Sequence, residues 1–251
     1  MPDHLTTPQG RSLAYHRLPG KGPGVVFLGG FRSDMTGTKA LWLEDWMQAH
    51  GHAFLRFDYS GHGASSGDFA DGCIGDWAQD AMAAITSLTN GPQVLVGSSM
   101  GGWIALLTAR AMPDRVTGLV GIAAAPDFTE DSLWADMTMA ERDALQSLGH
   151  IARPSDYADE PYVFTRRLIE DGRDHLVLRA PLHLPFPTRF LQGTADADVP
   201  VSVALRLIDH ATGPDIRLTL VKGADHRFST PDCLALVGAA VEDILQRSAD
   251  A

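Results

Sequence analysis

One stretch decides the fold: Gln93-Val94-Leu95-Val96-Gly97-Ser98-Ser99-Met100-Gly101-Gly102-Trp103-Ile104-Ala105-Leu106-Leu107. A short apolar run enters a cluster of small residues and leaves as an apolar helical pattern, which predicts a strand, a sharp turn and a helix. The bend reads Gly-x-Ser-x-Gly, with Ser99 at its tip. Such a turn strains the serine backbone and brings strand and helix so close that the positions two residues to either side must be small. The pattern therefore makes Ser99 a candidate nucleophile.

The same short motif occurs a second time, as Gly63-Ala64-Ser65-Ser66-Gly67, so its context has to decide between the two. The strand-like run before this second copy ends several residues too early, at Asp58. The residues after it, 68–72, have the composition of a loop and not of a helix start. We therefore interpret Ser65 as a loop residue and Ser99 as the nucleophile. The alternative for Ser99 is an inert serine in a tight turn between strand and helix.

The 251 residues are long enough for one large α/β domain, and we expect a single domain over residues 1–251. Lys and Arg total 20 against 31 Asp and Glu, a net charge of -11, which argues against nucleic acid or an anionic membrane as a partner. No run of about 18 apolar residues is present, so we expect no membrane span. The first residues lack the basic and apolar regions of a signal peptide, and Cys73 and Cys233 form no CxxC pair, so we expect a reducing, cytoplasmic location.

Strands and helices alternate along most of the chain. The patterns predict strands over 12–18, 25–28, 53–58, 93–98, 116–123, 188–192 and 216–221, and helices over 38–50, 74–88, 100–112, 201–209 and 233–247. Such alternation requires right-handed crossovers and a mostly parallel, doubly wound sheet.

The alternation pauses between about 126 and 187, and we interpret this segment as a helical cap inserted between the core strands over 116–123 and 188–192. Some 60 residues between two core strands are too many for a structureless loop in a compact domain. The cap is rich in large apolar residues, most of which we expect to form its own small core while a minority face the active site: Trp134, Met137, Met139, Leu145, Leu148, Tyr157, Tyr162 and Phe164.

A serine nucleophile needs a base and an orienting carboxylate, which in this architecture follow it in the order Ser, Asp or Glu, His. Of the ten histidines, His226 lies just beyond the last predicted strand, where the base belongs. The acid should follow the strand over 188–192, where Asp196 and Asp198 both occur. We favour Asp196, at the tight turn, because Asp198 lies nearer the helix start, where a carboxylate also suits a first turn.

The oxyanion of the tetrahedral intermediate needs two backbone donors. One is the amide of Met100, the residue after the nucleophile, and the other should come from the loop Gly29-Gly30-Phe31 that follows the second core strand. We choose the Phe31 amide, because the two glycines allow this backbone to approach closely. The alternative is that the glycines form only a turn.

Several segments together resemble the α/β-hydrolase superfamily and, within it, the family of α/β-hydrolase domain-containing protein ten. They are Gly37-Thr38-Lys39-Ala40-Leu41, 51–61, 91–103 and Asp225-His226-Arg227. The resemblance implies a palmitoyl-protein thioesterase (S-depalmitoylase) or an acyl-glucuronide esterase, with the nucleophile on Ser99, the acid on Asp196 and the base on His226. One departure is Gln192-Gly193, where such enzymes often have His-Gly.

We therefore expect a serine hydrolase that cleaves acyl esters or thioesters through an acyl-enzyme, with no metal or organic cofactor. Its partner is a small ester or an acylated protein. Trp103, Arg166 and Arg167 are expected to contact substrate, although the two arginines also fit a solvated pair on a helix face. The alternatives are a small-molecule carboxylesterase or peptidase on the same scaffold, and a homologue that binds a ligand without catalysis.

Overall fold

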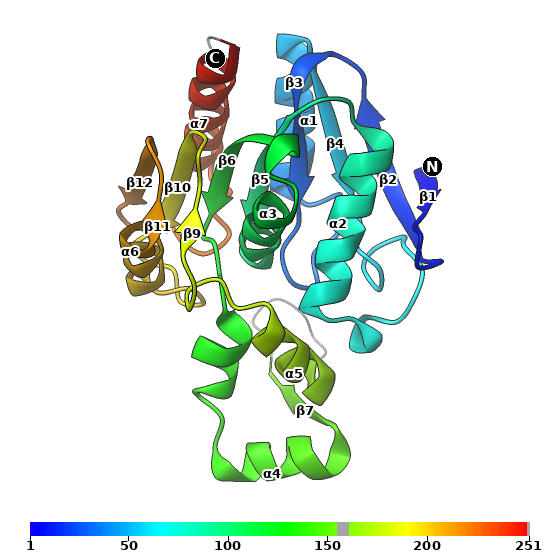
Figure 1. Cartoon of the computed structure of the whole chain (residues 1–251). Coiled ribbons are helices and arrows are strands. Elements are labelled where there is room, and N and C mark those ends of the chain that lie inside the picture. The colour runs from blue at the N-terminus through cyan, green and yellow to red at the C-terminus, as the bar shows by residue number, and fades with distance from the viewer. Residues whose placement is uncertain (155–160, 250–251) are drawn as a thin grey trace.

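A single eight-stranded sheet forms the centre of the computed structural model, which describes residues 1–154 and 161–249 (Figure 1). The order across the sheet is β1-β2-β4-β3-β5-β6-β10-β12. β1 and β2 run antiparallel to their neighbours, and all other pairs are parallel. The sheet is thus mostly parallel, as the alternation predicts. Its strands are β1 (Asp3–Thr6), β2 (Ser12–Leu18), β3 (Lys21–Leu28), β4 (His52–Phe57), β5 (Gln93–Ser98), β6 (Val116–Ile122), β10 (Thr188–Gly193) and β12 (Ile216–Val221).

Helices cover both faces of this sheet. One face carries α1 (Thr38–His50) and α7 (Pro231–Ala249), and the other carries α2 (Ile74–Leu88), α3 (Met100–Ala111) and α6 (Val201–His210). Alternate residues of β3 point into the two layers, since Val25 and Phe27 pack with α1 and α7 while Val26 and Leu28 pack with α2 and α3. This explains why the central strands are continuous apolar runs. Among the described helices, none is both long and apolar enough to cross a membrane.

Two features of the sheet differ from the sequence-based prediction. β1 was not predicted, because its short polar sequence has no periodicity of its own and pairing with β2 holds it in place. β3 begins at Lys21, four residues before the predicted strand over 25–28, and the register with β4 shifts between Lys21 and Val25. Gly20 is needed before it, since a Cβ there would lie 2.3 Å from the His52 carbonyl carbon.

The predicted cap segment, residues 126–187, lies between β6 and β10 and projects from one end of the sheet (Figure 1). It has a small core of its own, formed by Leu133, Met137, Leu145, Ile151 and Ile169. The cap is not only helical, because β7 and β8 form an antiparallel hairpin. Residues 155–160, including Tyr157, lie outside the described residues. The cap elements are a π-helical turn (Thr129–Trp134), α4 (Met139–Leu148), β7 (His150–Arg153), β8 (Tyr162–Thr165), α5 (Arg166–Asp174) and β9 (Leu182–His183), which pairs with β11 (Ala211–Thr212).

The parallel register brings four loops to one edge of the sheet. β3 and β5 end level with each other, and so do β5 and β6, and β10 and β12. The segments that follow these strands, 29–33, 99–102, 194–200 and 222–229, therefore leave the sheet at its carboxyl edge, where open α/β sheets bind their ligands.

Candidate active site

Ser99 stands at the tip of a strained turn between β5 and α3. Its backbone has φ 55° and ψ -120°, and residues with a side chain rarely adopt a positive φ. The surrounding chain holds this conformation in place. The Ser99 amide donates to the Ile122 carbonyl at 2.9 Å, and the Ser99 carbonyl accepts from the amides of Gly102 at 2.9 Å and Ala125 at 3.1 Å.

The glycines around this serine are sterically required. A Cβ on Gly97 would lie 2.3 Å from the Gly101 carbonyl oxygen, and one on Gly101 would lie 2.0 Å from the carbonyl oxygen of Leu28. A Cβ on Gly102 would lie 2.6 Å from that of Ala124. These distances agree with the close approach of strand and helix that the sequence pattern predicts.

The second Gly-x-Ser-x-Gly has a structural role. The Ser65 hydroxyl donates to the Asp58 carbonyl at 2.7 Å and accepts from the Ala14 amide at 2.8 Å. Both bonds tie the glycine-rich loop to β2 and to the end of β4. Ser65 is therefore a loop residue, as its context predicts.

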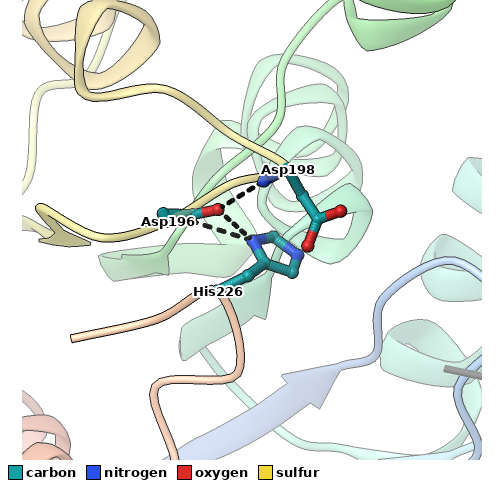
Figure 2. Close-up of side chains that lie close together, drawn as sticks. All are labelled: Asp196, Asp198 and His226. Carbon is teal, nitrogen blue, oxygen red and sulfur yellow. Dashed lines mark hydrogen bonds and ion pairs between the residues drawn. The ribbon is translucent and has the colours of Figure 1, made fainter. Parts of the chain in front are cut away.

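Three residues from distant loops meet at the carboxyl edge of the sheet. His226 Nε2 lies 3.1 Å from Ser99 Oγ, and His226 Nδ1 lies 2.9 Å from Asp196 Oδ2 and 3.1 Å from Oδ1. Figure 2 shows the imidazole edge turned toward Asp196. Because a carboxylate only accepts, Nδ1 carries the proton and Nε2 presents its lone pair to the serine. This geometry can move a proton from Ser99 to His226.

Asp196 is completely enclosed by donors. Its side chain is 0% exposed, and it accepts from Gln192 Nε2 at 2.9 Å and from the amides of Asp198 at 3.0 Å and Val199 at 2.8 Å. Burial alone would raise the pKa of Asp196, but the hydrogen bonds from His226, Val199 and Gln192 outweigh it and hold the pKa below its ordinary value. Gln192 is thus a direct partner of the acid, a role that its position at the end of a strand did not reveal.

Asp198, the rival acid, occupies a different place. Its backbone amide donates to Asp196, while its exposed carboxylate lines the pocket beside His226 (Figure 2). Asp196, Asp198 and His226 offer ligand atoms within 4.8 Å of one another, a spacing at which a cation could be held. Both ring nitrogens of His226 already face hydrogen-bond partners, however, so an ion held by all three residues would break the contacts with Asp196 or Ser99.

The predicted oxyanion donors lie beside the serine. Phe31 and Met100 both line the pocket that contains Ser99. The glycine loop approaches closely, since a Cβ on Gly30 would lie 3.4 Å from that of Ser99. Within the described part of the chain, neither the Phe31 nor the Met100 amide donates a hydrogen bond, so both are available to an oxyanion.

The pocket at the serine has a volume of about 630 Å³ and an aromatic wall. The Phe31 ring is at the centre of this wall, stacked on Phe164 at 5.5 Å and edge-on to Phe128 at 5.8 Å. Beneath the wall it packs on Phe69 and Trp77. The apolar lining residues from the cap are Phe128, Leu133, Tyr162 and Phe164. Among the described residues that line the pocket, the charged side chains are those of Arg32, Lys39, Arg153, Arg227 and Asp198. Apart from Asp198, which was considered as the acid, none of these charged residues was predicted as a site residue. Lys39 and Arg227 lie in segments that carry the family resemblance, but the sequence pattern assigned neither of them a role.

The three expected substrate contacts lie elsewhere. Trp103 belongs to α3 and is fully buried, and its indole donates to the His175 carbonyl at 3.1 Å. Arg167 pairs with Asp76 at 2.6 Å, and Arg166 lies 3.7 Å from Glu170. The described wall of the pocket includes none of the three. One turn beyond Ser99, the tryptophan faces the interior. The two partly exposed arginines begin α5, and Arg167 contacts Asp71 and Asp76 instead of the pocket. This placement disagrees with the expectation of substrate contact and fits the alternative of a solvated pair for the arginines.

Comparison with known proteins agrees with the fold. Residues 24–166 match the Hydrolase_4 family, described as serine aminopeptidase, S33. The chain is 36% identical over 244 residues to the rat palmitoyl-protein thioesterase ABHD10, mitochondrial, covering 97% of this chain and 82% of the relative.

Two solved structures are also similar over nearly their whole length. A putative hydrolase from Agrobacterium vitis S4 has a TM-score of 0.94 at 40% identity and covers 98% of each chain. Mouse α/β-hydrolase domain-containing protein 10 has a TM-score of 0.91 at 34% identity, covering 98% of this chain and 99% of its own. Similarity of this extent in both sequence and structure shows that the chain is an α/β-hydrolase and belongs to the ABHD10 family.

Proposed function

We propose that this chain is a serine hydrolase that cleaves acyl thioesters or esters through an acyl-enzyme. The observation that carries the proposal is the hydrogen-bonded series Ser99–His226–Asp196 beside a pocket with an aromatic wall. The ABHD10 relatives, which are named palmitoyl-protein thioesterases, support the ester and thioester class.

In the proposed reaction, His226 takes the Ser99 proton as Oγ attacks the acyl carbon. The developing oxyanion accepts from the amides of Phe31 and Met100, and Asp196 holds the imidazolium in place. The tetrahedral intermediate then expels the thiolate or alkoxide, which receives the proton from His226. A water molecule gives its proton to His226, adds to the acyl carbon and releases the carboxylate, and Ser99 regains its proton.

The lining of the pocket favours an acyl chain as the part of the substrate that binds against the aromatic wall. Phe31, Phe128, Tyr162 and Phe164 offer an apolar surface close to Ser99. A palmitoyl-protein thioesterase and an acyl-glucuronide esterase both fit this arrangement, and a thiol with a pKa of ~8.5 leaves readily from the same triad.

A peptidase is the second candidate, because the matched family is described as serine aminopeptidase. An aminopeptidase must bind the cationic amine of its substrate. The described wall of the pocket carries the basic residues Arg32, Lys39, Arg153 and Arg227 against a single acid, Asp198. This charge balance favours neutral or anionic substrates and therefore the esterase.

The proposal is tested by labelling with a fluorophosphonate and by turnover of an amide, an oxyester and a thioester of one acyl group. Ser99→Ala should abolish labelling and lower turnover by about 10⁴–10⁶-fold, as in other triad knockouts. Ser98→Ala, at the neighbouring position of the pocket, is the matched control and should keep the label. Persistent labelling of Ser99→Ala, or turnover of the amide above both esters, would contradict the proposal.

A cytoplasmic location forms part of the proposal. Cys73 and Cys233 are both free, which suits a reducing compartment. The names of the relatives give a mitochondrial location for those proteins. Fractionation of the source cells with antibody detection decides between the compartments.

A further inference from the structure

The loop that carries His226 is anchored on one side by the sheet and the core. The Ala224 carbonyl accepts from the Ala195 amide at 3.0 Å, which ties the loop to the segment bearing Asp196. Phe228 is fully buried, and its amide donates to Asp225 Oδ1 at 3.1 Å. Its φ of 49° is strained for a bulky residue, so this turn depends on the contacts around it.

Lys39 anchors the same loop from the opposite side. It belongs to the first turn of α1 and lines the pocket together with Ser99 and His226. Its Nζ donates a short hydrogen bond to the carbonyl of Arg227, the residue directly after His226. A half-buried ammonium donating to a carbonyl makes a charge-assisted bond, about twice as strong as a neutral one.

Charged and titratable groups from two elements face this ammonium. Asp225 and Arg227 belong to the loop, and Cys233 comes from α7. Burial lowers the pKa of Lys39 to about 8, and Asp225 opposes part of that shift. The charge on Lys39 is therefore lost at mildly alkaline pH.

We propose that Lys39 is a positioning residue for His226, holding the 225–229 loop so that the imidazole stays aligned with Ser99. The inference rests on the proposed function, in which His226 is the base. The bond to the peptide that follows His226 limits how far the ring can withdraw from the serine. Small displacements of a catalytic group are costly, about 10²-fold for 1 Å.

The test compares wild type with Lys39→Met, which keeps the length of the side chain without its charge, and with Lys39→Arg, which keeps a cation. The readouts are the rate constant for fluorophosphonate labelling and the kcat and KM of a neutral thioester. Lys39→Met should lower labelling and kcat by about tenfold with KM unchanged, and Lys39→Arg should recover part of the loss.

The pH dependence separates positioning from a merely structural role. From about pH 7 to about pH 9.5, wild type should lose part of its advantage over Lys39→Met, because the neutral amine donates a weaker hydrogen bond than the ammonium, while Lys39→Arg keeps its own advantage. A ratio that stays constant over this range overturns the proposal. So does an effect confined to KM, which would make Lys39 a substrate contact.

Failures of the two proposals are distinguishable. Wild type that does not label at Ser99 contradicts the proposed function itself. Wild type that labels at Ser99 while Lys39→Met labels equally fast contradicts only the role of Lys39. Should Lys39→Met fail to fold, Lys39→Gln and the comparison of wild type with Lys39→Arg across pH give the same two outcomes.

Discussion

Replacing Asp196 by asparagine changes one atom and tests the proposed proton path at its most constrained point. Every described polar contact of this carboxylate is with a donor. Oδ1 accepts from the amides of Asp198 and Val199, and Oδ2 accepts from Gln192 Nε2 and lies closest to His226 Nδ1. An asparagine side chain has an accepting carbonyl oxygen and a donating NH₂ group. Its NH₂ group must therefore face groups that are themselves donors.

The backbone decides which end that is. The two amides at Oδ1 cannot reorient, so the asparagine carbonyl occupies this side and its NH₂ group faces Gln192 and His226. Gln192 cannot simply turn its amide around, because Nε2 also donates to the Val199 carbonyl at 2.9 Å. His226 must therefore accept at Nδ1 and carry its proton on Nε2, which leaves no lone pair for the Ser99 proton.

The expected loss follows from this wrong tautomer. An asparagine at the equivalent position of a serine protease triad lowers kcat by about 10⁴-fold, which corresponds to about 5 kcal/mol of transition-state stabilisation. The fold should also lose stability at neutral pH. Because the pKa of Asp196 is depressed in the folded state, the carboxylate stabilises the fold above its unfolded pKa of ~3.9, and this contribution disappears as the pH falls through the lower folded pKa.

Single-turnover kinetics with a chromogenic thioester measure the effect, with fluorophosphonate labelling as a second readout. Asp198→Asn is the matched control: the same change two residues away, on an exposed carboxylate, should cost only a few-fold. Asp196→Asn activity within tenfold of wild type would refute the tautomer argument. A larger loss in Asp198→Asn than in Asp196→Asn would identify Asp198 as the acid.

Three further predictions concern the aromatic wall of the pocket, the buried core and the strained turn at Ser99. Phe31→Ala removes the ring that anchors the oxyanion loop and should cost about 3 kcal/mol in chemical unfolding and at least tenfold in kcat, whereas Phe128→Ala, which leaves that loop anchored, should change mainly KM. Burial lowers the pKa of His62 to about 4, well below its unfolded value of ~6.5, so between these values the unfolded state binds one more proton. The free energy of unfolding of wild type should therefore decrease by ~1.4 kcal/mol for each unit by which the pH falls in this range. Urea unfolding of His62→Gln at several pH values should show that this slope is gone. Gly101→Ala places a Cβ 2.0 Å from the Leu28 carbonyl oxygen and should destabilise the fold by about 1–3 kcal/mol in thermal unfolding. A variant as stable as wild type would contradict the steric explanation of the turn at Ser99.

The core of the fold could be predicted from sequence because its elements carry strong local signals. The strands over 12–18 and 216–221 and the helices over 38–50 and 74–88 have the bounds that the patterns predict. The helix over 38–50 ends where Gly51 takes a φ of 71°, a left-handed cap that glycine accommodates without strain. Where pattern and cap chemistry agree, tertiary contacts have little left to decide.

Elements that depend on pairing were not predictable in this way. β1 and the β7–β8 hairpin are each four residues per strand, too short for a period to be recognised. The burial of Trp103 does not agree with the expected substrate contact, for a related reason. Proximity to Ser99 along the chain says nothing about which side of α3 the indole occupies, and the indole is buried in the interior.

The site itself divides along the same line. Ser99, Asp196 and His226 could be predicted as a candidate triad because chemistry constrains each of them: a strained turn needs glycines, and an acid and a base are expected after particular strands of a parallel sheet. Lys39 and Gln192 have no such constraint in the sequence. Lys39 reaches a carbonyl 188 positions further along the chain, and Gln192 donates to Asp196 only because the loop after β10 folds back on the strand. A motif identifies the groups that react, whereas the groups that hold them in position are selected by whatever neighbour the fold supplies. Variants of Lys39 and Gln192 are therefore where substitution of residues outside the motifs should affect catalysis most.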